Sequence, residues 1–148
     1  MLISRRGVLS AGAGLAAFAL LPVAVRAQGA AAVPTQTADE VIAEFTGGAE
    51  VVDGDGVKLT APEIAENGNT VPISVEAPGA SEIMVLAVEN PTPGVAKFVF
   101  GPLAATQAAA TRIRLAKTQD VVAIAKMADG SFVRTASNVK VTIGGCGG

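Results

Sequence analysis

Turn-forming residues divide most of this chain into segments that are too short for helices but long enough for β-strands. Glycine, proline, asparagine and aspartate gather at Asp53–Gly56, Asn67–Asn69, Pro78–Gly79, Asn90–Gly94 and Asp129–Gly130. Such clusters favour tight turns, because glycine adopts positive φ angles and proline fixes its own φ. The last cluster separates two apolar stretches, which predicts a hairpin there. From Val51 onward we therefore predict an all-β domain.

Seven candidate strands lie between or beside these turns. Apolar and polar residues alternate in several of them, for example at Val71, Ile73 and Val75, which is the pattern of a strand with one buried face. The candidates are Gly56–Thr60, Val71–Ala77, Glu82–Asn90, Ala96–Gly101, Ala110–Leu115, Asp120–Met127 and Phe132–Ile143. A bend near Ser137 and Asn138 would divide the last one. Strands of this length and spacing predict two antiparallel sheets packed as a sandwich.

A short helix is expected before the first strand. Thr37 and Glu40 have the spacing of a capping box, in which each residue satisfies a backbone N–H group of the other. The apolar residues that follow can share one face of the helix: Val41, Ile42 and Phe45. Gly47 and Gly48 then end it.

The first residues have the order of an export signal. Arg5 and Arg6 precede an uncharged apolar run over residues 7–25, and Ala27 follows in the context of a cleavage site. We expect residues 1–27 to be a twin-arginine signal peptide, residues 28–36 to be a mobile leader, and the mature protein to reach the periplasm. The alternative is a membrane anchor, because the apolar run is just long enough to cross a bilayer. Its glycine content favours a removed signal, which leaves no membrane association.

The mature chain is acidic and contains no histidine. Signal removal takes away three of the 11 basic residues and none of the 13 acidic ones, so the net charge becomes −5. An acidic surface disfavours nucleic-acid binding. Without histidine the chain cannot form a Ser–His or Cys–His nucleophile, and a single cysteine cannot provide a zinc site. We therefore expect a protein that is not an enzyme and that holds no cofactor or metal.

The single cysteine, Cys146, stands in a glycine-rich carboxyl terminus. The alternating segment that ends at Ile143 runs directly into Gly144, Gly145, Cys146, Gly147 and Gly148. Glycine has no Cβ and a wide range of backbone conformations. We therefore expect residues 144–148 to be a flexible arm that presents the thiol to a narrow cleft in another protein, roughly 10 Å beyond Ile143.

Three other interpretations of Cys146 compete with this one. A lone cysteine is often a small buried hydrophobic residue, but the flanking glycines and the terminal position disfavour burial. A frayed tail without function is a second possibility, although an exposed thiol in an oxidising compartment would then be a liability. The third is an intermolecular disulfide in a secreted structural subunit. The residues alone leave both the carrier and the crosslinking subunit open.

Several stretches of the chain resemble one known family. They are Phe45–Gly48, Ala61–Pro72, Thr111–Gln119, Met127–Phe132 and Val141–Gly148. Together they are similar to SoxY, the carrier subunit of thiosulfate oxidation, over essentially the whole mature chain. The resemblance implies an immunoglobulin-like sandwich over residues 37–143 and identifies Cys146 as the residue that holds the substrate covalently.

The resemblance also implies partners. A SoxZ-like subunit would form a heterodimer with this chain, and the haem protein SoxAX would join thiosulfate to Cys146 by oxidation. The hydrolase SoxB would then release sulfate, and a sulfane dehydrogenase would oxidise the sulfur that is left. This favours a periplasmic carrier of thiosulfate-derived sulfur over the crosslinking subunit.

Overall fold

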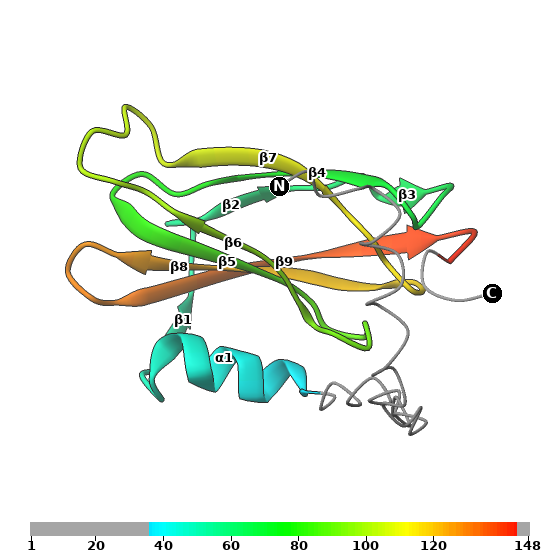
Figure 1. Ribbon diagram of the computed structural model, residues 1–148, viewed down its shortest axis with the longest axis horizontal. Helices are drawn as coiled ribbons and strands as arrows, with labels where there is room; N and C mark the ends of the chain where they lie inside the picture. Colours follow the sequence, from blue (N-terminus) through cyan, green and yellow to red (C-terminus); the bar gives the residue numbers. More distant parts are fainter. Residues whose placement is uncertain (1–35, 145–148) are drawn as a thin grey trace, which may run out of the picture. The chain divides into compact units, whose positions relative to one another are not determined.

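The computed structural model describes residues 36–144, so the predicted signal peptide, nearly all of the predicted leader and residues 145–148 lie outside the described range. The described part consists of two β-sheets and one helix (Figure 1). Its elements are α1 (Ala38–Thr46), β1 (Val51–Asp53), β2 (Lys58–Thr60), β3 (Ile64–Ala65), β4 (Val71–Glu76), β5 (Ala80–Ala87), β6 (Gly94–Val99), β7 (Ala108–Ile113), β8 (Gln119–Met127) and β9 (Phe132–Val141). The predicted all-β sandwich is confirmed. Within residues 36–144 no helix has the length and apolar character needed to cross a membrane.

The larger sheet is built around the long strand β9. β9, β8, β5 and β6 follow one another in antiparallel pairs. Two short strands that the turn pattern did not predict, β1 and β3, pair in parallel with opposite ends of β9. The smaller sheet contains β2, β4 and β7 in antiparallel pairs. Consequently the carboxyl-terminal end of β9 is flanked by β3 on one side and β8 on the other.

The seven predicted strands correspond to β2 and β4–β9, with shifted ends. The predicted bend near Ser137 and Asn138 is wrong, because both residues stay in register with β8 and Asn138 donates a hydrogen bond to the carboxylate of Asp120 at 2.7 Å. β5 stops at Ala87 instead of Asn90, since the Asn90 N–H turns back to the Ala87 carbonyl at 3.1 Å. β9 is thus one continuous strand that leads to the arm.

The main core lies between the two sheets. The alternating residues of β4 point inward, and Val71, Ile73 and Val75 are all buried. They pack in one cluster with apolar residues of the larger sheet, including Ile83 and Val121. The period-two pattern seen in the sequence therefore corresponds to a real buried face.

Helix α1 covers the outer face of the larger sheet, so that the layers run helix, larger sheet, smaller sheet (Figure 1). The predicted capping box is present: Glu40 N–H donates to Thr37 Oγ1 at 3.3 Å, and Thr37 N–H donates to the Glu40 carboxylate at 2.7 Å. The helix ends at Gly47, whose φ of 64° is the left-handed value that glycine adopts freely. Phe45 meets Phe132 of β9 edge to face, with ring centroids 5.7 Å apart.

Candidate functional site at the root of the arm

Only one residue of the predicted arm, Gly144, belongs to the described part of the chain. Gly145, Cys146, Gly147 and Gly148 lie outside it, as do the signal residues Arg5 and Arg6. The site is therefore built up from the place where the arm begins, here called the arm root and defined as residues 140–144.

Strand β3 holds the first part of the arm root. Lys140 N–H donates to the carbonyl of Glu63 at 2.9 Å. Thr142 donates twice to the carbonyl of Ala65, through its N–H group at 3.0 Å and through its hydroxyl at 3.2 Å. These bonds continue the parallel pairing of β3 with β9 past the end of the strand.

Two loops hold the rest of the arm root. The first, residues 66–70, joins β3 to β4, and the second, residues 114–118, joins β7 to β8. The buried Gly68 connects them, because its N–H donates to the Ile143 carbonyl at 2.7 Å and its carbonyl accepts from Leu115 N–H at 2.8 Å. From the second loop, Thr118 Oγ1 accepts from Val141 N–H at 2.9 Å. The loop 66–70 thus bonds the chain at Ile143, and the loop 114–118 bonds it at Val141.

Gly144 is exposed, but its backbone lies close to the second loop. A Cβ atom added to Gly144 would fall closer than 3.0 Å to the carbonyl oxygen of Ala116, a separation that real Cβ atoms do not show. The nearest obstacle is backbone and not the end of a movable side chain. The first glycine of the predicted arm therefore lies where any side chain would collide with the domain.

A polar cluster fixes the loop that carries Ala116. Asn90 accepts from Ala116 N–H at 2.9 Å and donates to the Arg114 carbonyl at 2.7 Å. The side chain of Gln119, which is only 3% exposed, donates to Asn90 at 2.9 Å and to the Lys117 carbonyl at 3.1 Å. Its own carbonyl accepts from Glu89 N–H at 2.9 Å. Asn90 and Gln119 therefore satisfy each other and hold the loop from within.

The surface around the arm root mixes apolar and charged groups. Ile64 and Ile143 are 60% and 67% exposed, which is unusual for side chains of this size. Lys140 is also exposed and is the register partner of Ile64 in the β3–β9 pairing. Lys117 forms a 2.6 Å ion pair with Glu89 beside the polar cluster. The arm thus starts from a surface that offers both apolar and charged contacts.

The carboxyl groups whose pKa is shifted lie away from the arm root, and each shift has a structural explanation. Three exposed carboxylates have a lowered pKa because neighbouring donors stabilise their charged form. The main donors that lower each pKa are the Thr37 backbone for Glu40, the Arg134 side chain for Asp53 and the Ser131 side chain for Asp129. These groups cap a helix, join β1 to β9 and close a hairpin.

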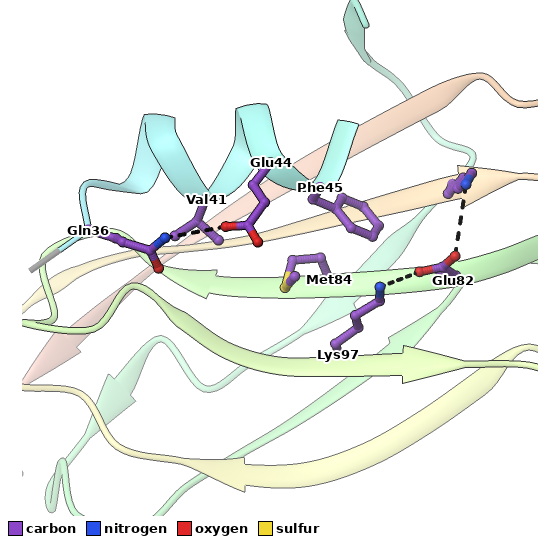
Figure 2. A pocket seen from close by; sticks show the side chains of 8 residues that line it. Gln36, Val41, Glu44, Phe45, Glu82, Met84 and Lys97 are labelled. Atoms are coloured by element: carbon purple, nitrogen blue, oxygen red, sulfur yellow. Dashed lines mark hydrogen bonds and ion pairs between the residues drawn. The ribbon is translucent and has the colours of Figure 1, made fainter. Parts of the chain in front are cut away.

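A groove of about 420 Å³ lies between α1 and the outer face of the larger sheet (Figure 2). Its charged side chains are already partnered. Glu82 accepts from Lys97 at 2.6 Å and lies 3.9 Å from Lys126. Glu44 accepts from Gln36 at 3.3 Å. We assign no function to this groove, because these contacts occupy its polar groups.

Sequence reasoning missed the residues that hold the arm root. Gly68, Ala116 and Gln119 fall within the stretches Ala61–Pro72 and Thr111–Gln119 that carry the family resemblance, but most of their contacts are made by backbone atoms. Backbone contacts leave little trace in residue type. The one available signal was Gly68, a buried glycine in a turn cluster.

Comparison with known proteins decides the family. The family model described as "Sulfur oxidation protein SoxY" matches residues 42–146, so its match ends at Cys146. The chain belongs to the SoxY family. The structure of the sulfur carrier protein SoxY from Chlorobium limicola f thiosulfatophilum is 36% identical in sequence, with a TM-score of 0.63, and the match covers 71% of this chain and 96% of that one.

A superoxide reductase (neelaredoxin) from Ignicoccus hospitalis shares the fold of this SoxY-family chain. It is 18% identical, with a TM-score of 0.51, over 57% of this chain and 79% of the reductase. At that identity the likeness concerns the fold alone. A comparison with curated protein sequences found no match. The family resemblance stated from the sequence is confirmed by the family match and by the SoxY structure.

Proposed function

We propose that this SoxY-family chain carries thiosulfate-derived sulfur covalently on Cys146 and delivers it to partner enzymes. The observation that supports this most is the family match, which runs to residue 146 and thus includes the only cysteine of the chain. The named function of the similar Chlorobium protein, sulfur carrier, agrees with it.

The described geometry of the arm root supports a carrier role in a second way. Gly144 is packed against the domain, and Cys146 follows two residues later. Two extended residues span at most about 7 Å, and this length limits how far Cys146 can reach from the loops 66–70 and 114–118. A partner enzyme that receives the thiol must then approach the arm root, where Ile64 and Ile143 are exposed.

The proposed chemistry begins with an oxidative coupling. The Cys146 thiolate and the outer sulfur of thiosulfate form a sulfur–sulfur bond, the thiol proton is released, and a pair of electrons passes to a haem partner of the SoxAX kind. Water then attacks the terminal sulfonate sulfur at a SoxB-like hydrolase. Sulfate leaves with the oxygen of that water, and a persulfide stays on Cys146.

The sulfur atom that remains on Cys146 can also be released as sulfate, after it has been oxidised. A sulfane dehydrogenase would oxidise the persulfide sulfur to a sulfonate, with water supplying the oxygen atoms and the dehydrogenase accepting the electrons. A second hydrolysis would release sulfate and restore the thiol. The carrier contributes attachment and delivery, and tethering keeps each intermediate at high effective concentration.

The proposal includes location and partners. A twin-arginine signal containing Arg5 and Arg6 would export the folded chain to the periplasm, and a SoxZ-like subunit would form the heterodimer. Because SoxAX, SoxB and the dehydrogenase would each supply their own catalytic groups, this chain is not an enzyme in the proposed scheme.

Intact mass spectrometry and non-reducing electrophoresis of the mature protein test the proposal against the crosslinking alternative. After incubation with thiosulfate and the partner haem protein, a carrier shows a thiosulfate adduct on a single chain, which reducing agent removes. A crosslinking subunit shows only a doubled mass that collapses to the single chain on reduction. The second result would refute the carrier role.

A further inference from the structure

We propose that Gly144 is the fixed end of the arm, and that Asn90 and Gln119 are positioning residues that set the direction in which the arm leaves the domain. The inference rests on the proposed function, since it concerns how Cys146 is presented. It changes the sequence-based expectation that Gly144 moves with the rest of the arm.

The arm root is restrained along its length. Thr142 bonds to Ala65, Ile143 bonds to Gly68, and Gly144 rests against Ala116. The contacts come from β3 and from both loops, so they restrain the arm root from different sides. Hydrogen bonds hold Thr142 and Ile143, and the Ala116 carbonyl limits the space beside Gly144, so the arm root is restrained as far as Gly144.

Residue 144 is glycine for reasons of space and not of backbone conformation. The positive-φ glycines of the described chain are Gly47, Gly48, Gly79 and Gly130, and Gly144 is not among them. Its backbone conformation therefore does not call for glycine. The space does, because the Ala116 carbonyl oxygen occupies the position of a side chain. Glycine at 144 permits a close approach and fixes the chain, which is the opposite of a hinge.

The polar cluster of Asn90 and Gln119 holds the loop that carries Ala116. Ala116 lies in the loop 114–118. Asn90 bonds to this loop twice, accepting from the Ala116 N–H and donating to the Arg114 carbonyl. Gln119 in turn orients Asn90 at 2.9 Å. Within residues 36–144 the bonds of these two side chains go to the loop 114–118, to each other and to Glu89, so we infer that both act through the position of Ala116.

The inference is tested with a nitroxide label on Cys146, the only cysteine. In the labelled mature protein we expect broadening of a defined set of amide signals around the arm root. Gly144→Ala and Asn90→Ala are expected to change that set. The matched controls are Gly101→Ala, where an added Cβ meets nothing within 4 Å, and Asn138→Ala, whose partner Asp120 is exposed. Both controls should keep the wild-type set.

Unchanged broadening in Gly144→Ala or in Asn90→Ala, with the amide signals of the core intact, would overturn the inference. If one variant does not fold, the other still provides the test. A change of equal size in the controls would also overturn it, because the effect would then not depend on the contact with Ala116.

A second measurement tests whether the placement of Gly144 affects the loading of Cys146 by the partner haem protein. We expect Gly144→Ala to slow thiosulfate loading by the partner haem protein by roughly 10- to 100-fold, as small misplacements do in enzymes. Alkylation of the same thiol by iodoacetamide should be unchanged, because a small reagent needs no particular direction. Loading at the wild-type rate would contradict the inference. If the wild-type protein itself is not loaded, the proposed function fails, while the label experiment still decides where Gly144 is held.

Discussion

Replacing Gln119 by alanine should destabilise the protein and loosen the arm root together. The side chain is 3% exposed and makes three hydrogen bonds of 2.9, 2.9 and 3.1 Å. With about 0.5–1.5 kcal/mol net for each of the three bonds, we expect a loss of about 1.5–4.5 kcal/mol in the free energy of unfolding. Urea denaturation followed by circular dichroism measures the change. Hydrogen exchange at the Leu115 and Val141 amides should accelerate as well.

Gln107→Ala is the matched control. Gln107 is partly exposed and makes two longer hydrogen bonds, of 3.3 and 3.4 Å, so its removal should cost less than about 1 kcal/mol. If Gln119→Ala costs no more than the control, the polar cluster does not stabilise the loop 114–118. If Gln119→Ala destabilises the protein as predicted but hydrogen exchange at the Val141 amide is not faster, the cluster is not coupled to the arm root.

Three further predictions concern other parts of the chain. Phe132→Ala removes the buried ring that meets Phe45, and it should cost about 3–5 kcal/mol in urea denaturation; a loss below 1 kcal/mol would mean that α1 does not depend on this contact. Hydrogen bonds from Arg134 lower the pKa of Asp53 below its usual 3.8, so the stabilisation from this pair is complete above that pH and is lost as the pH falls through the lowered value. Asp53→Asn should therefore flatten this part of the acid-unfolding curve, and an unchanged curve would count against the ion pair. Gly145→Val should slow transfer to partner enzymes by roughly tenfold or more without changing iodoacetamide reactivity, and unimpaired transfer would show that partner clefts tolerate a branched side chain there.

The sequence predicted those parts of the fold that depend on local patterns. The capping box at Thr37 and Glu40 and the strand containing Val71, Ile73 and Val75 follow from spacing, and the structure confirms both. The short strands β1 and β3 could not be predicted, because segments of three and two residues show no period. Each exists only because β9 offers a free edge to a segment that is distant in sequence.

The reactive group of the candidate site could be predicted from the sequence, but the residues that support it could not. The chemical group, Cys146 among glycines, is visible in the sequence, whereas its support is not. Asn90 lies in a turn cluster, where asparagine is expected for local reasons, and nothing in its neighbourhood indicates a bond to Gln119. The sequence predicts that Gly144 is flexible. Glycine, however, serves either backbone flexibility or the close approach of another chain segment, and only the position of Ala116 distinguishes the two.

The carrier role itself is tested most directly by loading the wild-type protein and Cys146→Ser side by side. Each is mixed with thiosulfate, the SoxZ-like subunit and the oxidising haem protein, and intact masses are recorded before and after reduction. We expect a reducible thiosulfate adduct on the wild-type chain and none on Cys146→Ser, with both chains folded and bound to the partner subunit. An equal adduct on Cys146→Ser, or none on the wild-type chain while the haem protein is active, would contradict the assignment of Cys146 as the sulfur-carrying residue.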